Sequence, residues 1–131
     1  MSEESFELFV NGTLMRGLAL HHNIADAEYL GDSMTQPCYR VYSINDIHPG
    51  MFRLNDDEPG GISVPGELYR VTAAQWARIE AGEPPNLYRG KITLVSGRSV
   101  WGILYPRELA ELNGRDITSF GGWRQYMTQR V

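Results

Sequence analysis

The sequence has one cysteine, few basic residues and no long apolar run. Cys38 alone cannot form an internal disulfide, which is typical of a reducing compartment, so we expect a cytoplasmic protein. The net charge of −4 argues against a nucleic-acid partner, because such proteins usually present a basic surface. No stretch of about 18 apolar residues is present, so we expect no membrane span. The acidic start of the chain also lacks the basic-then-apolar layout of a signal peptide.

Residues that bind metals or cofactors are equally scarce. His21 and His22 are adjacent, so on a helix their side chains would point about 100° apart and could not share a metal ion. No other group of cysteines and histidines has the spacing of a metal site. The acidic segment 55–61 does not match a calcium-binding loop. We therefore expect no metal and no cofactor, and a small molecule as the substrate.

The length and the apolar pattern predict one α+β domain spanning residues 1–131. The chain contains 42% apolar residues, which is sufficient for one modest core, and no repeat or linker divides it. Alternating apolar residues predict several strands, interspersed with a few helices, which favours a curled, mostly antiparallel sheet or barrel with flanking helices. The expected strands are 6–10, 26–32, 35–44, 51–54, 62–71, 86–95 and 99–105; the expected helices are 20–24, 73–83, 106–112 and a C-terminal segment near 120–127, and 48–50 is expected to form a turn.

The loop after the first predicted strand is a candidate binding site. Asn11 and Gly12 end the strand, because both residue types tolerate positive φ and allow a sharp turn. The backbone amides of Gly12, Thr13 and Leu14 would then point together toward an anion or a developing oxyanion. The alternative is a purely structural turn.

Two glutamates near the end of a predicted helix are candidate acid–base groups. Thr72 and Gln75 have the spacing of a capping box at the start of this helix, and Pro84 ends it. Glu80 and Glu83 lie three residues apart, near one face. The negative end of the helix dipole would raise the pKa of a carboxyl group there, which suits a base near neutral pH. The alternative is a solvated helix end.

These two regions together resemble the γ-glutamylcyclotransferase-like family. The resemblance lies in FVNGTLMRG (9–17), in GELY (66–69) and in the run from IEAGE (79–83) to LYR (87–89). It implies that family's fold, with Glu83 as the catalytic base, Glu80 as the preceding acid and Tyr88 in the pocket wall. The loop Asn11–Leu14 would bind the substrate, although Asn11 replaces the usual tyrosine. The implied reaction is attack of a substrate's α-amine on its own γ-carbonyl, which releases 5-oxoproline and an amine.

Other stretches are similar to the C-terminal domain of allophanate hydrolases, itself a cyclotransferase-like fold. These are Pro37, YRVY (39–42), LHH (20–22) and DITSFGGWRQY (116–126). The resemblance implies decarboxylation of N-carboxycarbamate, the product of an upstream amidase that this chain lacks. His22 and Arg89 are further candidates for the site. A non-catalytic small-molecule-binding subunit is a third alternative, and the partner would be a second copy of the chain or an amidase.

Overall fold

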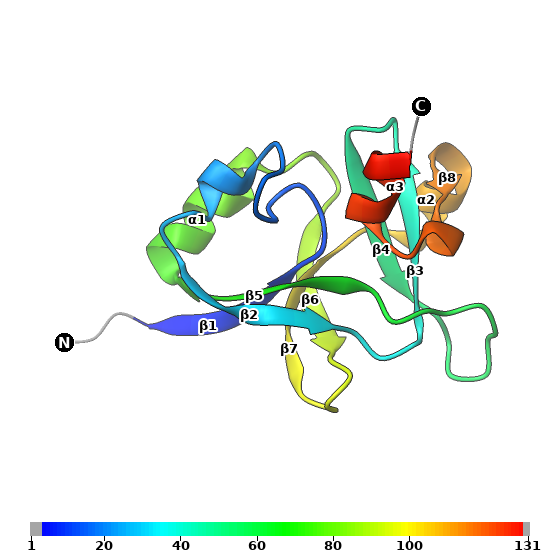
Figure 1. Ribbon diagram of the computed structural model, residues 1–131, viewed down its shortest axis with the longest axis horizontal. Coiled ribbons are helices and arrows are strands. Elements are labelled where there is room, and N and C mark those ends of the chain that lie inside the picture. The colour runs from blue at the N-terminus through cyan, green and yellow to red at the C-terminus, as the bar shows by residue number, and fades with distance from the viewer. Residues whose placement is uncertain (1–3, 130–131) are drawn as a thin grey trace.

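Two β-sheets form the body of the fold in the computed structural model, which describes residues 4–129 (Figure 1). Three α-helices and two short 3₁₀ helices connect and flank the strands. The strands are β1 (Ser5–Val10), β2 (Glu28–Met34), β3 (Tyr39–Ile44), β4 (His48–Arg53), β5 (Pro65–Thr72), β6 (Tyr88–Thr93), β7 (Ser99–Leu104) and β8 (Arg115–Asp116); the helices are η1 (His21–Asn23), α1 (Ala73–Gly82), α2 (Arg107–Asn113), η2 (Thr118–Phe120) and α3 (Trp123–Gln129).

The larger sheet has five strands in the order β2-β5-β1-β7-β6. Its pairs are antiparallel except β1 with β7, so the predicted mostly antiparallel sheet is confirmed. The ladder stays open: its edge strands β2 and β6 do not pair, and the segments that follow them meet only at an isolated bridge between Thr35 and Leu94. The sheet is therefore curled without closing into a barrel.

The smaller sheet has the order β4-β3-β8, and its first hairpin corrects one sequence prediction. Residues 48–50 were expected to form a turn, yet they begin β4, where Pro49 pairs with Ser43. The chain instead reverses earlier, at Asn45 and Asp46, whose φ angles of 56° and 58° are tolerated best by these residue types. Pro49 is accommodated because β4 is an edge strand.

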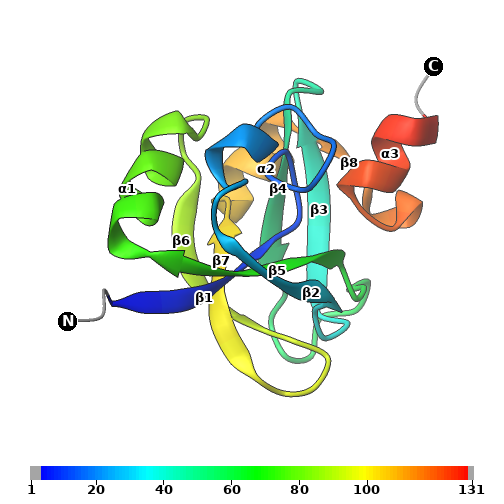
Figure 2. The ribbon, with the colours of Figure 1, turned by 60° about the vertical axis from the view of Figure 1, so that its left-hand side comes forward.

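Helix α1 begins and ends as its sequence predicts. Thr72 accepts a hydrogen bond from the backbone of Gln75, whose side chain accepts one from the Thr72 backbone, forming the expected capping box. Ile79 is the fully buried residue of the helix, and Glu83 follows as an extended C-cap before Pro84. Figures 1 and 2 place α1 at the opposite end of the molecule from α3.

The core fills the space between the two sheets and extends under α3. Phe9 and Leu68 from the large sheet meet Val41 from the small one, and Trp123 and Tyr126 of α3 pack on the same cluster. Trp123 is only 2% exposed, so the C-terminal segment is part of the core. Between residues 4 and 129, no helix is long and apolar enough to cross a membrane.

Candidate active site

The loop after β1 and the residue that caps α1 line one small cavity. Asn11, Gly12, Thr13 and Leu14 form one side of it, and Glu83 lies on another. The cavity has a volume of about 20 Å³, comparable to the space of a single water molecule. Its remaining lining residues are Val10, His48, Pro49, Leu87 and Ile103. The structure thus brings together the loop and the glutamate that the sequence pattern singled out separately.

The loop is fixed in a tight conformation by its own backbone. The Met15 amide donates to the Gly12 carbonyl at 3.0 Å, and the Leu20 amide donates to the Thr13 carbonyl at 2.9 Å. A Cβ atom on Gly12 would come within 2.7 Å of the Pro49 ring, so only glycine lets the loop approach β4 this closely. Within residues 4–129, the amides of Gly12, Thr13 and Leu14 donate to no acceptor. Their acceptors must therefore come from water or from a ligand.

Glu83 has an unusual carboxyl group. Its Oε2 atom is buried and has no hydrogen-bond partner within the described chain. Burial raises the pKa of Glu83 from 4.5 to about 7, because the surroundings disfavour the charged form. The sequence pattern suggested the helix dipole as the cause, whereas desolvation is the cause that the structure identifies. At neutral pH the group is therefore poised to give or take a proton.

Asn11 is a second buried group without a partner in the same cavity. Its side chain is 5% exposed, and its Nδ2 finds no acceptor among residues 4–129. A buried polar group without a hydrogen bond costs about 1–3 kcal/mol. Two such groups on one cavity, Asn11 and Glu83, indicate a polar site that is completed by a water molecule or by a polar atom of a ligand.

His48 is a cavity residue that the sequence analysis missed. Its ring is buried and packs 5.8 Å from the Tyr105 ring, between centroids. Nδ1 lies 2.9 Å from the Pro49 carbonyl oxygen, so Nδ1 carries the proton and Nε2 is left as an acceptor. Burial lowers the pKa of His48, which keeps the ring neutral. Its position in a strand could have indicated a buried histidine, but the His-Pro-Gly sequence predicted a turn instead.

The remaining candidates lie farther out or elsewhere. Tyr88 is 49% exposed and lines, with the exposed Glu80, an outer cavity of about 230 Å³ that also includes Glu83. Arg89 borders the same outer cavity, but its guanidinium stacks over the Trp101 ring at 4.5 Å. His22 is exposed on η1 and lines neither cavity.

The site has the means for acid–base chemistry on a small polar molecule. It combines a proton-exchanging carboxyl, a neutral imidazole acceptor and several unused N–H donors. Over the range 4–129, no three histidine, cysteine or carboxylate side chains are grouped to hold a metal ion.

Comparison with known proteins identifies relatives along nearly the whole chain. The sequence model of the allophanate hydrolase C-terminal domain matches residues 6–128. A protein specific to uropathogenic E. coli is 40% identical, with 98% of this chain and 99% of that chain covered and a TM-score of 0.87. Allophanate hydrolase from Kluyveromyces lactis is 26% identical with the same TM-score, over 98% of this chain but only 22% of the larger enzyme.

More distant similarity concerns the fold. An AIG2-like protein from Mus musculus is 23% identical, with 78% of this chain and 76% of that one covered and a TM-score of 0.59. It shares the predicted cyclotransferase-like architecture. No curated protein sequence matches this chain.

Proposed function

This chain belongs to the family of allophanate hydrolase C-terminal domains, and from that premise we propose that it is an acid–base enzyme acting on a small carbamate. In this proposal, Glu83 exchanges a proton with a substrate held by the loop Asn11–Leu14. The observation that carries the proposal is the small cavity in which a desolvated carboxyl, with a pKa of about 7, meets unused N–H donors.

Decarboxylation of N-carboxycarbamate fits these groups. The carbon–nitrogen bond to one carboxylate breaks, its electron pair stays on nitrogen, and carbon dioxide leaves. Nitrogen is a poor leaving group unless it receives a proton, so a general acid must deliver one. Glu83 is protonated in a large fraction of molecules near neutral pH, because its pKa is about 7, and water restores the proton after each turnover.

A doubly charged substrate would lie in the outer cavity of about 230 Å³, which Glu83 also lines, and would reach the inner cavity with no more than one polar atom, because the inner cavity holds about one water molecule. A neutral Glu83 does not repel carboxylates, whereas an ordinary ionised glutamate would. The amides of Gly12, Thr13 and Leu14 and the Asn11 side chain are donors that carboxylate oxygens accept, and inside a buried site such bonds are strong. The neutral His48 offers Nε2 as an acceptor for the substrate's N–H.

A second candidate reaction is cyclisation of a γ-glutamyl amine to 5-oxoproline. The outer cavity of about 230 Å³ favours it, because it adjoins Glu83 and has room for a longer substrate. Glu83 would then act as the base for the α-amine, and the loop amides would bind the oxyanion. Asn11 in place of the family's usual tyrosine favours the carbamate instead.

One pair of assays tests these reactions. An amidase that hydrolyses allophanate would generate N-carboxycarbamate in situ, and release of labelled carbon dioxide would be followed with and without this protein. We expect faster release with the wild type, no acceleration with Glu83→Gln, and near wild-type acceleration with the exposed-site control Glu80→Gln. A panel of γ-glutamyl amino acids, assayed for 5-oxoproline, tests the second reaction. Activity in neither assay would refute both and leave a non-catalytic binding subunit.

A further inference from the structure

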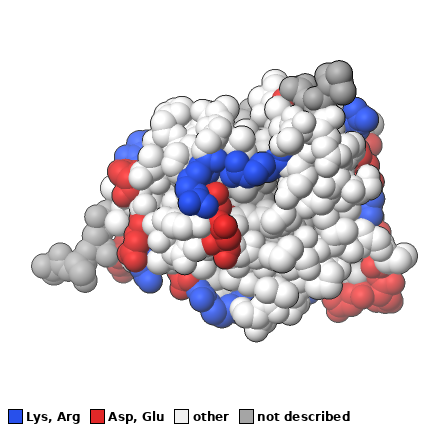
Figure 3. Space-filling view, viewed as in Figure 1, with Lys and Arg blue, Asp and Glu red and all other residues white. Residues whose placement is uncertain are grey.

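A third cavity, larger than the two that Glu83 lines, lies next to the end of the same loop. It has a volume of about 580 Å³ and shares no residue with the Glu83 cavity. It opens between β2, the start of β5, the loop after β1 and α3. Figure 3 shows basic and acidic side chains meeting around a hollow on this face of the molecule. The lining residues are Met15, Arg16, Asp32, Ser33, Met34, Pro65, Gly66, Glu67, Arg124 and Gln125.

The polar floor of this cavity is built around Glu67, whose side chain is only 5% exposed. Its carboxylate accepts from the Arg16 backbone amide at 3.0 Å, from Arg16 Nε at 3.1 Å and from the Tyr69 hydroxyl at 3.0 Å. Arg124 Nη2 lies farther away, at 3.4 Å. Both carboxylate oxygens of Glu67 are thus engaged by donors of the protein itself. Asp32 is similarly engaged through Oδ1, which accepts from Arg16 and Tyr29.

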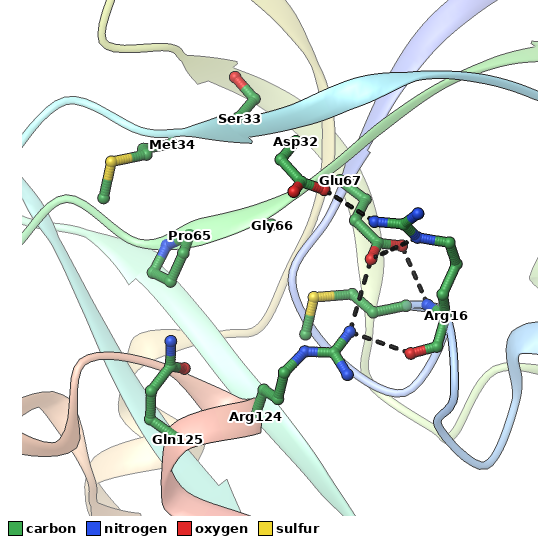
Figure 4. A pocket seen from close by; sticks show the side chains of 10 residues that line it. Arg16, Asp32, Ser33, Met34, Pro65, Gly66, Glu67, Arg124 and Gln125 are labelled. Atoms are coloured by element: carbon green, nitrogen blue, oxygen red, sulfur yellow. Dashed lines mark hydrogen bonds and ion pairs between the residues drawn. The ribbon is translucent and has the colours of Figure 1, made fainter.

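Arg124 is the arginine of this cavity whose guanidinium is only partly used in hydrogen bonds. Its Nη2 donates to the Arg16 carbonyl at 3.0 Å and makes the long contact with Glu67, but its Nε and Nη1 donate to nothing within residues 4–129. The neighbouring Gln125 has a buried Oε1 without a partner in the described chain. Figure 4 shows both side chains rising from α3, with Gln125 directed toward Pro65. A guanidinium presents paired donors, which match the two oxygens of a carboxylate.

The opposite walls are apolar. Met15 and Pro65 line the cavity, and Met34, 42% exposed at the end of the edge strand β2, lines it on the side of Pro65 (Figure 4). We propose that this cavity binds a small organic carboxylate with an apolar body, whose carboxylate pairs with Arg124 while its apolar part contacts the methionines and Pro65. Methionine side chains suit this task because they adapt to ligands of different shape.

The position of the cavity connects it to the candidate active site. Met15 and Arg16 follow directly on Asn11–Leu14, and the Met15 amide is bonded to the Gly12 carbonyl. The Arg16 amide ties the same loop to Glu67. A ligand on this network therefore contacts the loop whose other side faces Glu83. The proposal concerns binding alone and does not depend on the reaction proposed for Glu83.

Titration with N-acetyl-L-leucine, followed by amide chemical shifts, tests the proposal. N-acetyl-L-leucinamide is the matched neutral probe, because it has the same apolar body without the charge. We expect the acid to shift signals of Met15, Met34 and Gln125, and to bind at least about tenfold more tightly than the amide, which corresponds to about 1.4 kcal/mol.

Two variants locate the binding. Arg124→Gln should weaken binding of the acid about tenfold or more. Met34→Glu should weaken it too, by adding a negative charge at a half-exposed position of the edge strand β2. The control is Arg78→Gln, which alters an exposed arginine on α1 that lines neither cavity. Equal binding of acid and amide, unchanged binding by both variants, or shifts confined to the Glu83 cavity would overturn the proposal.

Discussion

Replacing Glu83 with glutamine should stabilise the protein, and by an amount that depends on pH. In the unfolded chain this carboxyl group has its ordinary pKa of 4.5, whereas in the folded protein its pKa is about 7. Below pH 4.5 both states are protonated, and the group costs nothing. Between 4.5 and 7 the unfolded state releases its proton first, so stability falls as pH rises through this window and stays low above it.

The magnitude follows from the difference between the two pKa values. At 1.36 kcal/mol per pH unit, the penalty above pH 7 reaches about 3 kcal/mol. Glutamine has the same shape and no charge, so Glu83→Gln removes the penalty. The free energy of unfolding of this variant should exceed that of the wild type by about 3 kcal/mol at pH 8 and by less than about 0.5 kcal/mol at pH 4.5, where the unfolded carboxyl is half ionised.

Urea denaturation of both proteins at pH 4.5, 6 and 8 measures this difference. The control is Glu80→Gln, because Glu80 is exposed on the same helix and should show no such dependence. The reasoning is refuted if Glu83→Gln destabilises the protein at pH 8, or if its effect is the same at all three values. Either result would mean that Glu83 is ionised and well solvated in the folded state.

Three further predictions concern the core, a close backbone contact and the second buried titratable group. Trp123→Ala should lower the free energy of unfolding by about 3–5 kcal/mol, because the ring is 2% exposed in the main core, and a loss under about 1 kcal/mol in denaturant titration would show that α3 is peripheral. Gly66→Ala should cost about 3 kcal/mol, since the added Cβ would lie 2.4 Å from the Val10 carbonyl oxygen, and an unchanged melting temperature would contradict this. His48→Phe should keep the packing on Tyr105 but reduce turnover about tenfold or more in whichever assay reports activity. Unchanged turnover would exclude a role for His48 Nε2.

Local patterns were sufficient to predict most of the fold. The capping box at Thr72 and Gln75 fixed the start of α1, and Pro84 fixed its end, because these signals act within a few residues. The turn predicted at residues 48–50 was wrong because the prediction depended on such local signals alone. His-Pro-Gly has turn chemistry locally, and only pairing with Ser43 across the hairpin makes it a strand. Such pairing is tertiary information that no local pattern contains.

The candidate site was predictable only in part. A loop motif marks Gly12, and a helix end marks Glu80 and Glu83 alike; the resemblance to the γ-glutamylcyclotransferase-like family selected Glu83. The resemblance also implied that Glu83 and the loop share one site, whereas the local pattern alone does not specify how the end of α1 returns to β1. Glu67 shows the same limit: it stood inside a strand pattern, and only the fold surrounds it with Arg16, Arg124 and Tyr69.

The most direct test of the central claim is the turnover of Glu83→Gln beside Glu80→Gln. The two variants make the same chemical change three residues apart. Both residues line the outer cavity, but only Glu83 also lines the desolvated inner cavity, whereas Glu80 is exposed. In the carbon dioxide or 5-oxoproline assay, Glu83→Gln should lose roughly 10²–10⁴-fold in turnover with its fold intact, while Glu80→Gln stays near the wild type. Full activity in Glu83→Gln, with or without loss in Glu80→Gln, would contradict the assignment of Glu83 as the proton-exchanging group.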